Sequence, residues 1–303
     1  MARLAMSGLP QREGHVSLGA GRRVAWSEWG PPDGRPVVLL EGMPGSSHYC
    51  PDVDATMDLG VRLISVDRPG YGHSDPLPGR TLADWPSDLA VLLQDLAIDA
   101  VPVAGWSSGA PFAIACAVAL PRVVTALALL AGDAPIDEVG GGLAAMPRER
   151  QERIALTRAD PAAARRQALQ RAQFYADDPE SIVPWRDAPP SEAEAAANPD
   201  AALFQAPEQR AALLEMFRHG ARQGAAGWVD DSIALSRPWG FALSAVACPT
   251  KVWFGAGDRI GRRADSEYLG RAIPGAELVI EPHDGHSVPV RHWREILEWL
   301  LAA

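Results

Sequence analysis

The sequence has few cysteines, and their distribution excludes two common uses of this residue. It contains three cysteines, at widely spaced positions: Cys50, Cys116 and Cys248. An odd number with no short spacing predicts neither a disulfide framework nor a zinc site. We therefore expect these side chains to be small buried hydrophobic residues, and we expect the protein to use no metal ion and no organic cofactor.

The sequence also has no uninterrupted apolar run long enough to cross a bilayer. Its most apolar region, 109–132, is divided by Pro121 and Arg122, and each piece is shorter than the ~20 residues that a membrane helix needs. The first ten residues lack the long apolar stretch of a signal peptide. These features predict a cytoplasmic protein that does not enter a membrane.

Basic residues are outnumbered by acidic ones, 28 against 38, so the formal net charge is −10. A surface of this sign repels nucleic acids and anionic membranes. The expected partner is therefore a small-molecule substrate, which responds to the local field of its pocket rather than to the net charge. The charge does not predict an oligomeric state.

Short β-type runs alternate with helical patterns in the first 130 residues and again near the end. The predicted strands are 36–40, 61–66, 101–104, 123–130, 250–254 and 277–280. The predicted helices are 47–58, 81–97, 107–119, 262–272 and 289–302. This alternation predicts an α/β fold with a mostly parallel central sheet flanked by helices. In the last helix, apolar residues recur at the helical period: Trp293, Ile296, Leu297, Leu300 and Leu301.

Between these two parts, the segment 135–243 has no convincing buried strand. It is rich in Ala, Arg, Glu and Gln, with helical stretches near 146–176 and 207–220. The simplest organisation is a core made of 1–134 and 244–303, interrupted by a helical insertion at 135–243.

The strongest local motif lies after the predicted strand at 101–104, and it reads Gly105-Trp106-Ser107-Ser108-Gly109. A serine flanked by glycines two residues away, between a strand and an apolar helix, is typical of a nucleophile elbow. The tight turn exposes the serine hydroxyl above the sheet and aims the N-terminus of the helix at the reacting centre. Ser107 is therefore the candidate nucleophile.

A serine hydroxyl needs a base, and the base needs an orienting acid. The loop after the last predicted strand contains His286, which we favour as the base, and His283, which is the alternative. Asp258 directly follows the strand at 250–254, whereas Asp133 follows the strand at 123–130. We favour Asp258, since the order Ser107, Asp258, His286 is the order expected for this kind of site.

The oxyanion that forms during acyl transfer needs hydrogen-bond donors. The backbone N–H groups of Met43, in the loop after the strand at 36–40, and of Ser108 are the candidates. Glu41 and Trp106 are candidate residues of the substrate pocket. We expect the Glu41 carboxylate to disfavour anionic substrates through like-charge repulsion.

With these motifs, the chain resembles the α/β-hydrolases of the branch that includes esterases, epoxide hydrolases and proline iminopeptidases. The turn Asp67-Arg68-Pro69-Gly70-Tyr71-Gly72-His73-Ser74 resembles the family's glycine-rich turn and is interpreted as structural. Two departures stand out: Glu41-Gly42 replaces the usual His-Gly, and serine at the nucleophile position argues against epoxide hydrolases and haloalkane dehalogenases.

The resemblance implies that the insertion is a cap over the active site. Its aromatic side chains either line an apolar pocket or form the cap's own core: Phe174, Tyr175, Trp185, Phe204, Phe217 and Trp228. We expect hydrolysis of a small, largely apolar carboxylic ester through an acyl-enzyme. Amide or peptide hydrolysis, lactone opening and C–C bond hydrolysis use the same triad and stay open, and a non-catalytic ligand-binding protein is the remaining alternative.

Overall fold

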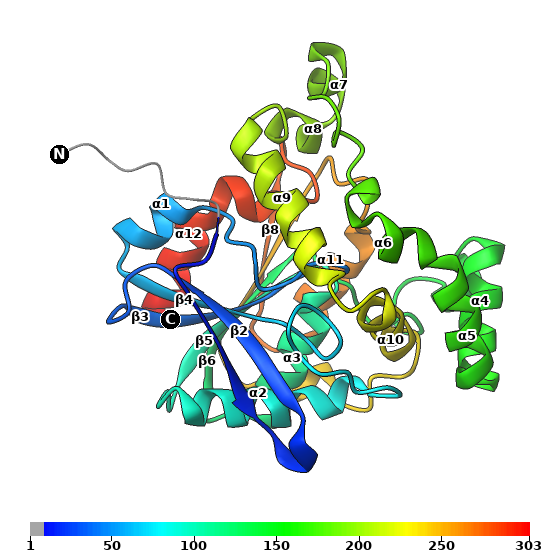
Figure 1. Cartoon of the computed structure of the whole chain (residues 1–303), viewed down its shortest axis with the longest axis horizontal. Coiled ribbons are helices and arrows are strands. Elements are labelled where there is room, and N and C mark those ends of the chain that lie inside the picture. Colours follow the sequence, from blue (N-terminus) through cyan, green and yellow to red (C-terminus); the bar gives the residue numbers. More distant parts are fainter. Residues whose placement is uncertain (1–8) are drawn as a thin grey trace.

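The computed structural model describes residues 9–303, which form one large sheet flanked by helices (Figure 1). The strands are β1 (Arg12–Ser17), β2 (Arg23–Trp29), β3 (Arg35–Leu40), β4 (Val61–Val66), β5 (Val101–Trp106), β6 (Val124–Leu130), β7 (Thr250–Gly255) and β8 (Glu277–Glu281). Their order across the sheet is β1-β2-β4-β3-β5-β6-β7-β8. β2 pairs antiparallel with both β1 and β4, and the other neighbouring strands pair parallel, which confirms the predicted fold class.

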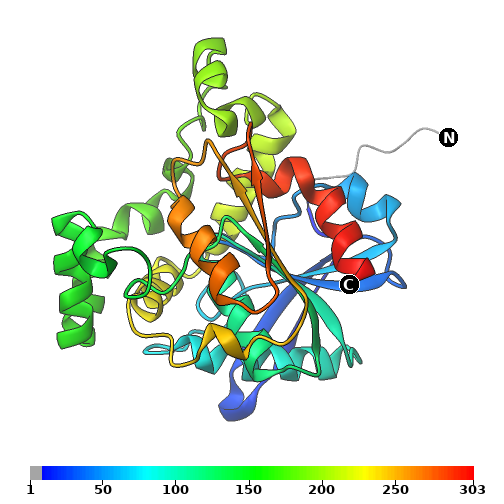
Figure 2. The same cartoon turned by 180° about the vertical axis from the view of Figure 1, so that it is seen from behind.

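Helices cover both faces of the sheet. They are α1 (Val53–Asp58), α2 (Trp85–Asp95), α3 (Gly109–Ala119), α11 (Arg263–Ala272) and α12 (Val288–Ala302). α1 and α12 pack on one face, and α2, α3 and α11 on the other, so that two separate apolar clusters form, one on each side. Figure 2 shows α11 lying beside β7 and β8. The predicted apolar stripe of α12 faces the sheet, with Trp293, Ile296 and Leu297 completely buried.

All six predicted strands are present, but β1 and β2 were not predicted. β1 lies at the sheet edge and buries only Val16, so its sequence lacks an apolar pattern. The predicted helix at 47–58 is also shorter in the structure, because α1 begins only at Val53, after the capping residue Asp52.

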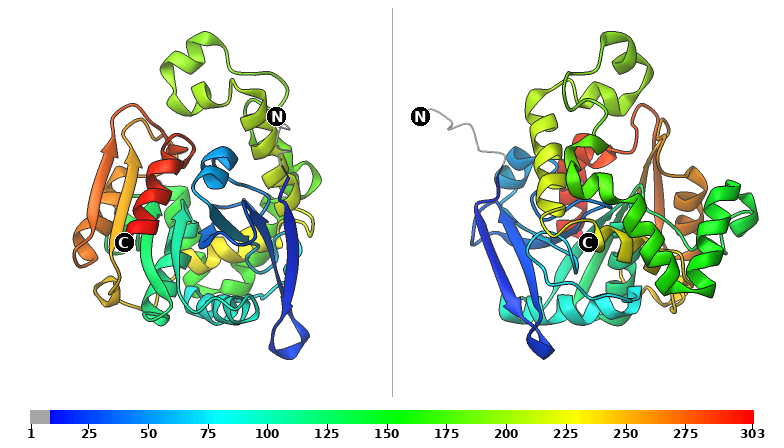
Figure 3. Two further views of the ribbon diagram at one scale, coloured as in Figure 1. Left: turned by 90° about the vertical axis from the view of Figure 1, so that its left-hand side faces the viewer. Right: turned by 45° about the vertical axis from the view of Figure 1, so that its right-hand side comes forward.

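The segment between β6 and β7 contains only helices and turns within the described residues. These are α4 (Arg148–Ala159), α5 (Pro161–Arg171), α6 (Gln173–Asp177), α7 (Glu192–Ala197), α8 (Pro199–Leu203), α9 (Pro207–Gly220) and α10 (Ala226–Leu235). The stretch predicted as one helix at 146–176 is divided because Asp160 caps a new helix that begins at Pro161. α4 and α5 form a hairpin at one side of the molecule, and α7 and α8 lie at one end (Figures 1 and 3).

The remaining sequence predictions concern cysteines and membranes. Cys50 and Cys116 are buried and Cys248 is partly exposed, and all three are free thiols. No helix within residues 9–303 combines the length and the apolar character needed to span a bilayer. The prediction about a signal peptide rests largely on residues 1–8, which lie outside the described part of the chain.

Candidate active site

The turn between β5 and α3 has the geometry of a nucleophile elbow. Ser107 has a φ of +53°, a strained conformation for a residue with a side chain. Its flanking glycines are sterically required: a Cβ at Gly105 would lie 2.6 Å from Cα of Ala110, and one at Gly109 would lie 2.0 Å from the Leu40 carbonyl oxygen. Because β5, α3 and β3 approach so closely, Ser107 is held at the carboxyl edge of the sheet.

The loop after β3 lies against this serine. A Cβ added to Gly42 would lie 2.8 Å from Cβ of Ser107, so only glycine permits this approach. Next to it, the backbone N–H of Met43 donates no hydrogen bond to any residue in the described part of the chain, and the same holds for the N–H of Ser108. Both donors therefore remain free for an oxyanion beside Ser107.

His286 and Asp258 form a buried pair. Nδ1 of His286 lies 2.8 Å from Oδ2 of Asp258, while the other oxygen accepts hydrogen bonds from the N–H groups of Ile260 and Gly261 at 2.7 and 2.8 Å. Burial favours a higher pKa for Asp258, but the hydrogen bond and charge of His286 and the two backbone donors outweigh it and lower this pKa. The carboxylate is thus kept ionised and can orient the imidazole.

The loop that carries His286 is held by an aspartate that sequence reasoning missed. Asp200 in α8 accepts hydrogen bonds from the backbone N–H of His286 at 3.0 Å and of Ser287 at 2.7 Å. Gly285 is required here because a Cβ would lie 2.4 Å from the Asp200 carboxylate. Asp200 lies in the middle of the helical insertion, and its sequence context signals only a helix start.

Trp106, the neighbour of Ser107, contacts His286 at the carboxyl edge of the sheet. The Trp106 indole donates a hydrogen bond to the His286 carbonyl at 3.0 Å, and the two rings lie 5.9 Å apart. The Ser107 hydroxyl forms no hydrogen bond with His286 in the described chain, a common feature of ligand-free sites. His283 is exposed on the same loop and makes none of these contacts.

Asp133, the alternative acid, lies on another side of the elbow. Its carboxylate accepts a hydrogen bond from the Ser108 hydroxyl at 2.9 Å, and its backbone N–H donates to the Ser107 carbonyl at 3.4 Å. It makes no contact with His286. Of the two candidate aspartates, only Asp258 is in position to orient the imidazole.

Glu41 is completely enclosed and has unusual surroundings. Neither carboxylate oxygen has a hydrogen-bond partner among the described residues. Burial raises the pKa of Glu41 well above its usual range, and the nearby Arg68 opposes this only in part. The neutral form is therefore favoured, which removes the basis for the expected repulsion of anionic substrates. The unpaired Tyr49 hydroxyl is buried nearby, and the Tyr49 ring stacks on Trp106 at 5.6 Å.

A cavity of about 450 Å³ lies between the insertion and the core. Met43 and Asp133 line it from the core side, and Phe174 and Trp228 line it from the insertion. The other four aromatic residues that were considered for the pocket pack instead in an apolar cluster shared with the sheet: Tyr175, Trp185, Phe204 and Phe217. Glu41 and Trp106, expected to line the pocket, are not among the residues around this cavity, because both are buried beneath the loops that form its floor.

The glycine-rich turn after β4 connects the core to the insertion. Arg68 donates to Asp231 of α10 at 2.8 Å, and Arg80 donates to the same carboxylate at 2.6 Å; all three side chains are nearly inaccessible. Asp67 in this turn pairs with His219 of α9 at 3.0 Å. The turn thus has the structural role that the sequence predicted.

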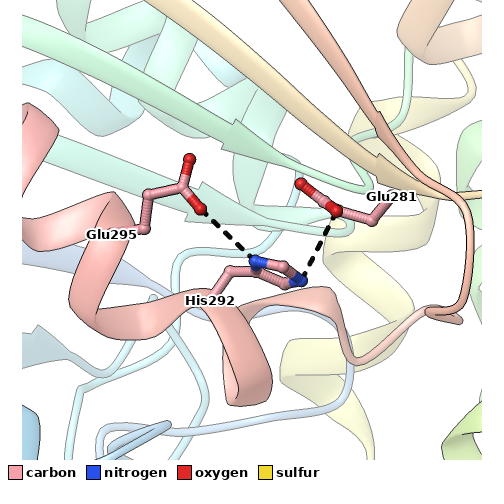
Figure 4. A group of neighbouring side chains, drawn as sticks. All are labelled: Glu281, His292 and Glu295. Atoms are coloured by element: carbon pink, nitrogen blue, oxygen red, sulfur yellow. Dashed lines mark hydrogen bonds and ion pairs between the residues drawn. The ribbon is translucent and has the colours of Figure 1, made fainter.

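A separate cluster of side chains has a composition that can bind a cation. Glu281, His292 and Glu295 each place a ligand atom within 4.8 Å of the others, at the end of β8 and the start of α12 (Figure 4). His292 lies 2.8 Å from Asp284, 3.7 Å from Glu281 and 3.4 Å from Glu295. Ion pairs to a protonated histidine account for the arrangement.

Comparisons with known proteins agree with the observed fold. The family described as alpha/beta hydrolase fold matches residues 35–292. A Klebsiella pneumoniae protein with the provisional name carbamate hydrolase RutD is 29% identical over 263 residues, or 85% of this chain and 86% of that protein. A thermophilic esterase from Thermogutta terrifontis has a TM-score of 0.68 at 23% identity, covering 96% of this chain and 98% of its own. For an alpha/beta hydrolase fold protein from Nakamurella multipartita the TM-score is 0.64 at 25% identity, with coverage of 96% and 99%.

Proposed function

This chain belongs to the α/β-hydrolase fold family and is a hydrolase, and we propose that it acts through a covalent acyl intermediate on Ser107. The observation that supports this most directly is the strained elbow of Ser107 beside the buried His286–Asp258 pair. A serine, a histidine and an ionised aspartate on the edge of one sheet are the groups that nucleophilic acyl transfer needs.

In the proposed mechanism, His286 accepts the proton of the Ser107 hydroxyl as the oxygen attacks a substrate carbonyl. Asp258 holds the imidazole in the required tautomer and stabilises its positive charge. The N–H groups of Met43 and Ser108 donate to the oxyanion. The leaving group takes the proton from His286 and departs, and a water molecule, deprotonated by the same histidine, then releases the acid.

We propose a small carboxylic ester as the substrate. The cavity beside the elbow has a size suited to a small molecule, and its walls include apolar side chains from α4 and α10 such as Ile154, Val229 and Ile233. Amides, lactones and C–C bonds stay as alternatives for the same residues, since the bond that is cleaved depends on how the substrate lies in the cavity.

Replacement of the nucleophile tests this proposal. Ser107→Ala is expected to abolish hydrolysis of a short aryl ester and labelling by a fluorophosphonate probe, while the melting temperature stays nearly unchanged. Catalysis of roughly 10³–10⁴ over water persists in comparable serine-protease variants. The matched control is Ser181→Ala, which removes an exposed hydroxyl of the insertion and should be labelled like the wild type.

Two outcomes would contradict the assignment. One is a Ser107→Ala protein that keeps more than about a tenth of the wild-type activity, and the other is a wild type that does not react with the probe. The second outcome would favour a ligand-binding protein that has this fold without the chemistry.

A further inference from the structure

The cavity beside the elbow carries a charge opposite to that of the whole protein. Its lining includes four arginines, Arg150, Arg153, Arg171 and Arg262, and two acidic residues, Asp133 and Asp265. Four positive and two negative side chains leave a surplus of two positive charges. Since the formal net charge of the chain is −10, this surplus is a local feature and not a reflection of the composition.

The surplus is concentrated on the α4–α5 hairpin. On the core side, Arg262 is neutralised by Asp265, with two hydrogen bonds of 2.5 and 3.0 Å. On the hairpin, Arg153 reaches the exposed Glu149 at 3.3 Å. Arg150 and Arg171 form no hydrogen bond or ion pair with any residue in the described part of the chain, although Arg150 lies near enough to Asp265 for its charge to act on that carboxylate. Two guanidinium groups that line the cavity therefore keep their full donor capacity.

Most other arginines of the same two helices are paired, which makes the two free ones distinctive. Arg148, Arg158 and Arg165 bind Glu152, Asp137 and Asp230 respectively. Arg166 is exposed and also unpaired, but it does not line the cavity. It therefore offers a matched control on the helix that ends at Arg171.

The cavity also reaches the proposed catalytic residues. Met43, a proposed oxyanion donor, and Asp133, whose N–H binds the Ser107 carbonyl, both line it from the core side. The core thus contributes the Asp133 carboxylate to the lining, whereas the hairpin contributes the two unpaired arginines. A substrate with an anionic group is therefore oriented with that group towards α4 and α5.

We propose that the substrate carries a carboxylate remote from the bond that is cleaved, and that Arg150 and Arg171 bind it. The planar guanidinium group matches a carboxylate with two parallel hydrogen bonds, which makes arginine suited to this recognition. The apolar side chains that line the cavity would contact the alkyl part of such a substrate. This inference rests on the proposed ester hydrolysis at Ser107 and adds the class of ester.

The test compares 4-nitrophenyl hydrogen suberate with its methyl ester, in which a neutral methoxycarbonyl group replaces the remote carboxylate. The wild type is expected to have the higher kcat/KM for the acid. In the double variant Arg150→Gln/Arg171→Gln, kcat/KM for the acid should fall about tenfold or more, mainly through KM, because charge-assisted hydrogen bonds are lost. The value for the methyl ester should change less than about twofold, and Arg166→Gln should alter neither.

A binding measurement separates failure of this inference from failure of the proposed chemistry. Calorimetry with monomethyl suberate on the Ser107→Ala protein should show binding that the two arginine substitutions weaken about tenfold or more, even if neither ester is turned over. Equal effects of the double substitution on both esters, a wild-type preference for the methyl ester, or binding of monomethyl suberate that is insensitive to Arg150 and Arg171 would each overturn the proposal.

Discussion

The two aspartates near the elbow show how position decides the role of one residue type. Asp258 accepts a hydrogen bond from the His286 imidazole, whereas Asp133 accepts one from the Ser108 hydroxyl. Both follow strands of the sheet, but only Asp258 meets the imidazole of His286. The same chemical group is thus a partner of the proposed base in one place and a neighbour of the nucleophile elbow in the other.

This difference leads to a prediction about two matched variants. Asp258→Asn is expected to lower kcat for a neutral aryl ester by about 10⁴, because the imidazole loses its orienting acceptor. Asp133→Asn should stay within about tenfold of the wild type, since its amide oxygen can still accept from Ser108. Both are measured on one ester at one pH, and the reverse ranking would move the acid to Asp133.

At the scale of elements, β8, α12 and the loop between them carry both the proposed base and an ion-pair cluster. His292 on α12 faces three carboxylates, which come from β8, from the loop and from α12 itself. Burial alone would lower the pKa of His292, but the hydrogen bonds to Asp284 and Glu295 and the charges of Glu281 and Asp284 raise it. The protonated histidine therefore links the loop to the helix.

A raised pKa in the folded state makes this link dependent on pH. The contribution of protonated His292 to the free energy of unfolding is fully present below about pH 6.5, the pKa of an unfolded histidine. It is lost as the pH rises through the higher pKa of the folded state. His292→Gln should therefore lower the free energy of unfolding by about 0.5–1 kcal/mol at pH 6 and much less at pH 9, as measured by urea unfolding.

The neighbouring histidine provides the control for this effect. His283 is exposed on the same loop and has no ion pair in the described chain, so His283→Gln should have little effect at either pH. A loss for His292→Gln that is equal at pH 6 and pH 9 would show that packing, rather than protonation, stabilises this part of the molecule.

In the whole molecule, the helical insertion and the sheet share one apolar cluster instead of forming two independent cores. Tyr175, Phe204 and Phe217 of the insertion pack with side chains of the sheet and of α12. The buried contact of Asp231 with Arg68 and Arg80 adds a polar connection across the same boundary. The insertion, which forms one wall of the cavity, is therefore held in place by the same packing that stabilises the core.

Removal of the shared carboxylate should accordingly destabilise the whole protein. Asp231→Asn leaves the buried Arg68 without its counter-charge and leaves Arg80 with only Asp230, 3.8 Å away. It is expected to lower the free energy of unfolding by about 3–5 kcal/mol. Asp137→Asn breaks an exposed pair with Arg158 and should cost at most about 1 kcal/mol. Denaturant unfolding of both variants checks this, and similar small losses would show that the buried contact is not needed for docking.

The sequence by itself determined those features that depend on local geometry. The nucleophile elbow can be identified at Ser107 because a strand-to-helix turn this tight requires glycine on both sides, at positions set by the backbone alone. The six parallel strands and α12 were predictable because buried strands form short apolar runs and the buried face of a helix repeats at the helical period. The edge strand β1 has no such pattern, since it buries almost nothing.

Only the tertiary structure decided which distant groups meet. The choice of Asp258 over Asp133, the enclosure of Glu41 and the contact of Asp200 with the His286 loop all depend on where separate segments lie in space. The surplus of positive charge in the cavity has the same origin. Arg150 and Arg171 have no distinctive sequence context, and they line the site only because the α4–α5 hairpin packs beside α10. Long-range packing, which no local pattern encodes, sets these distances and charges.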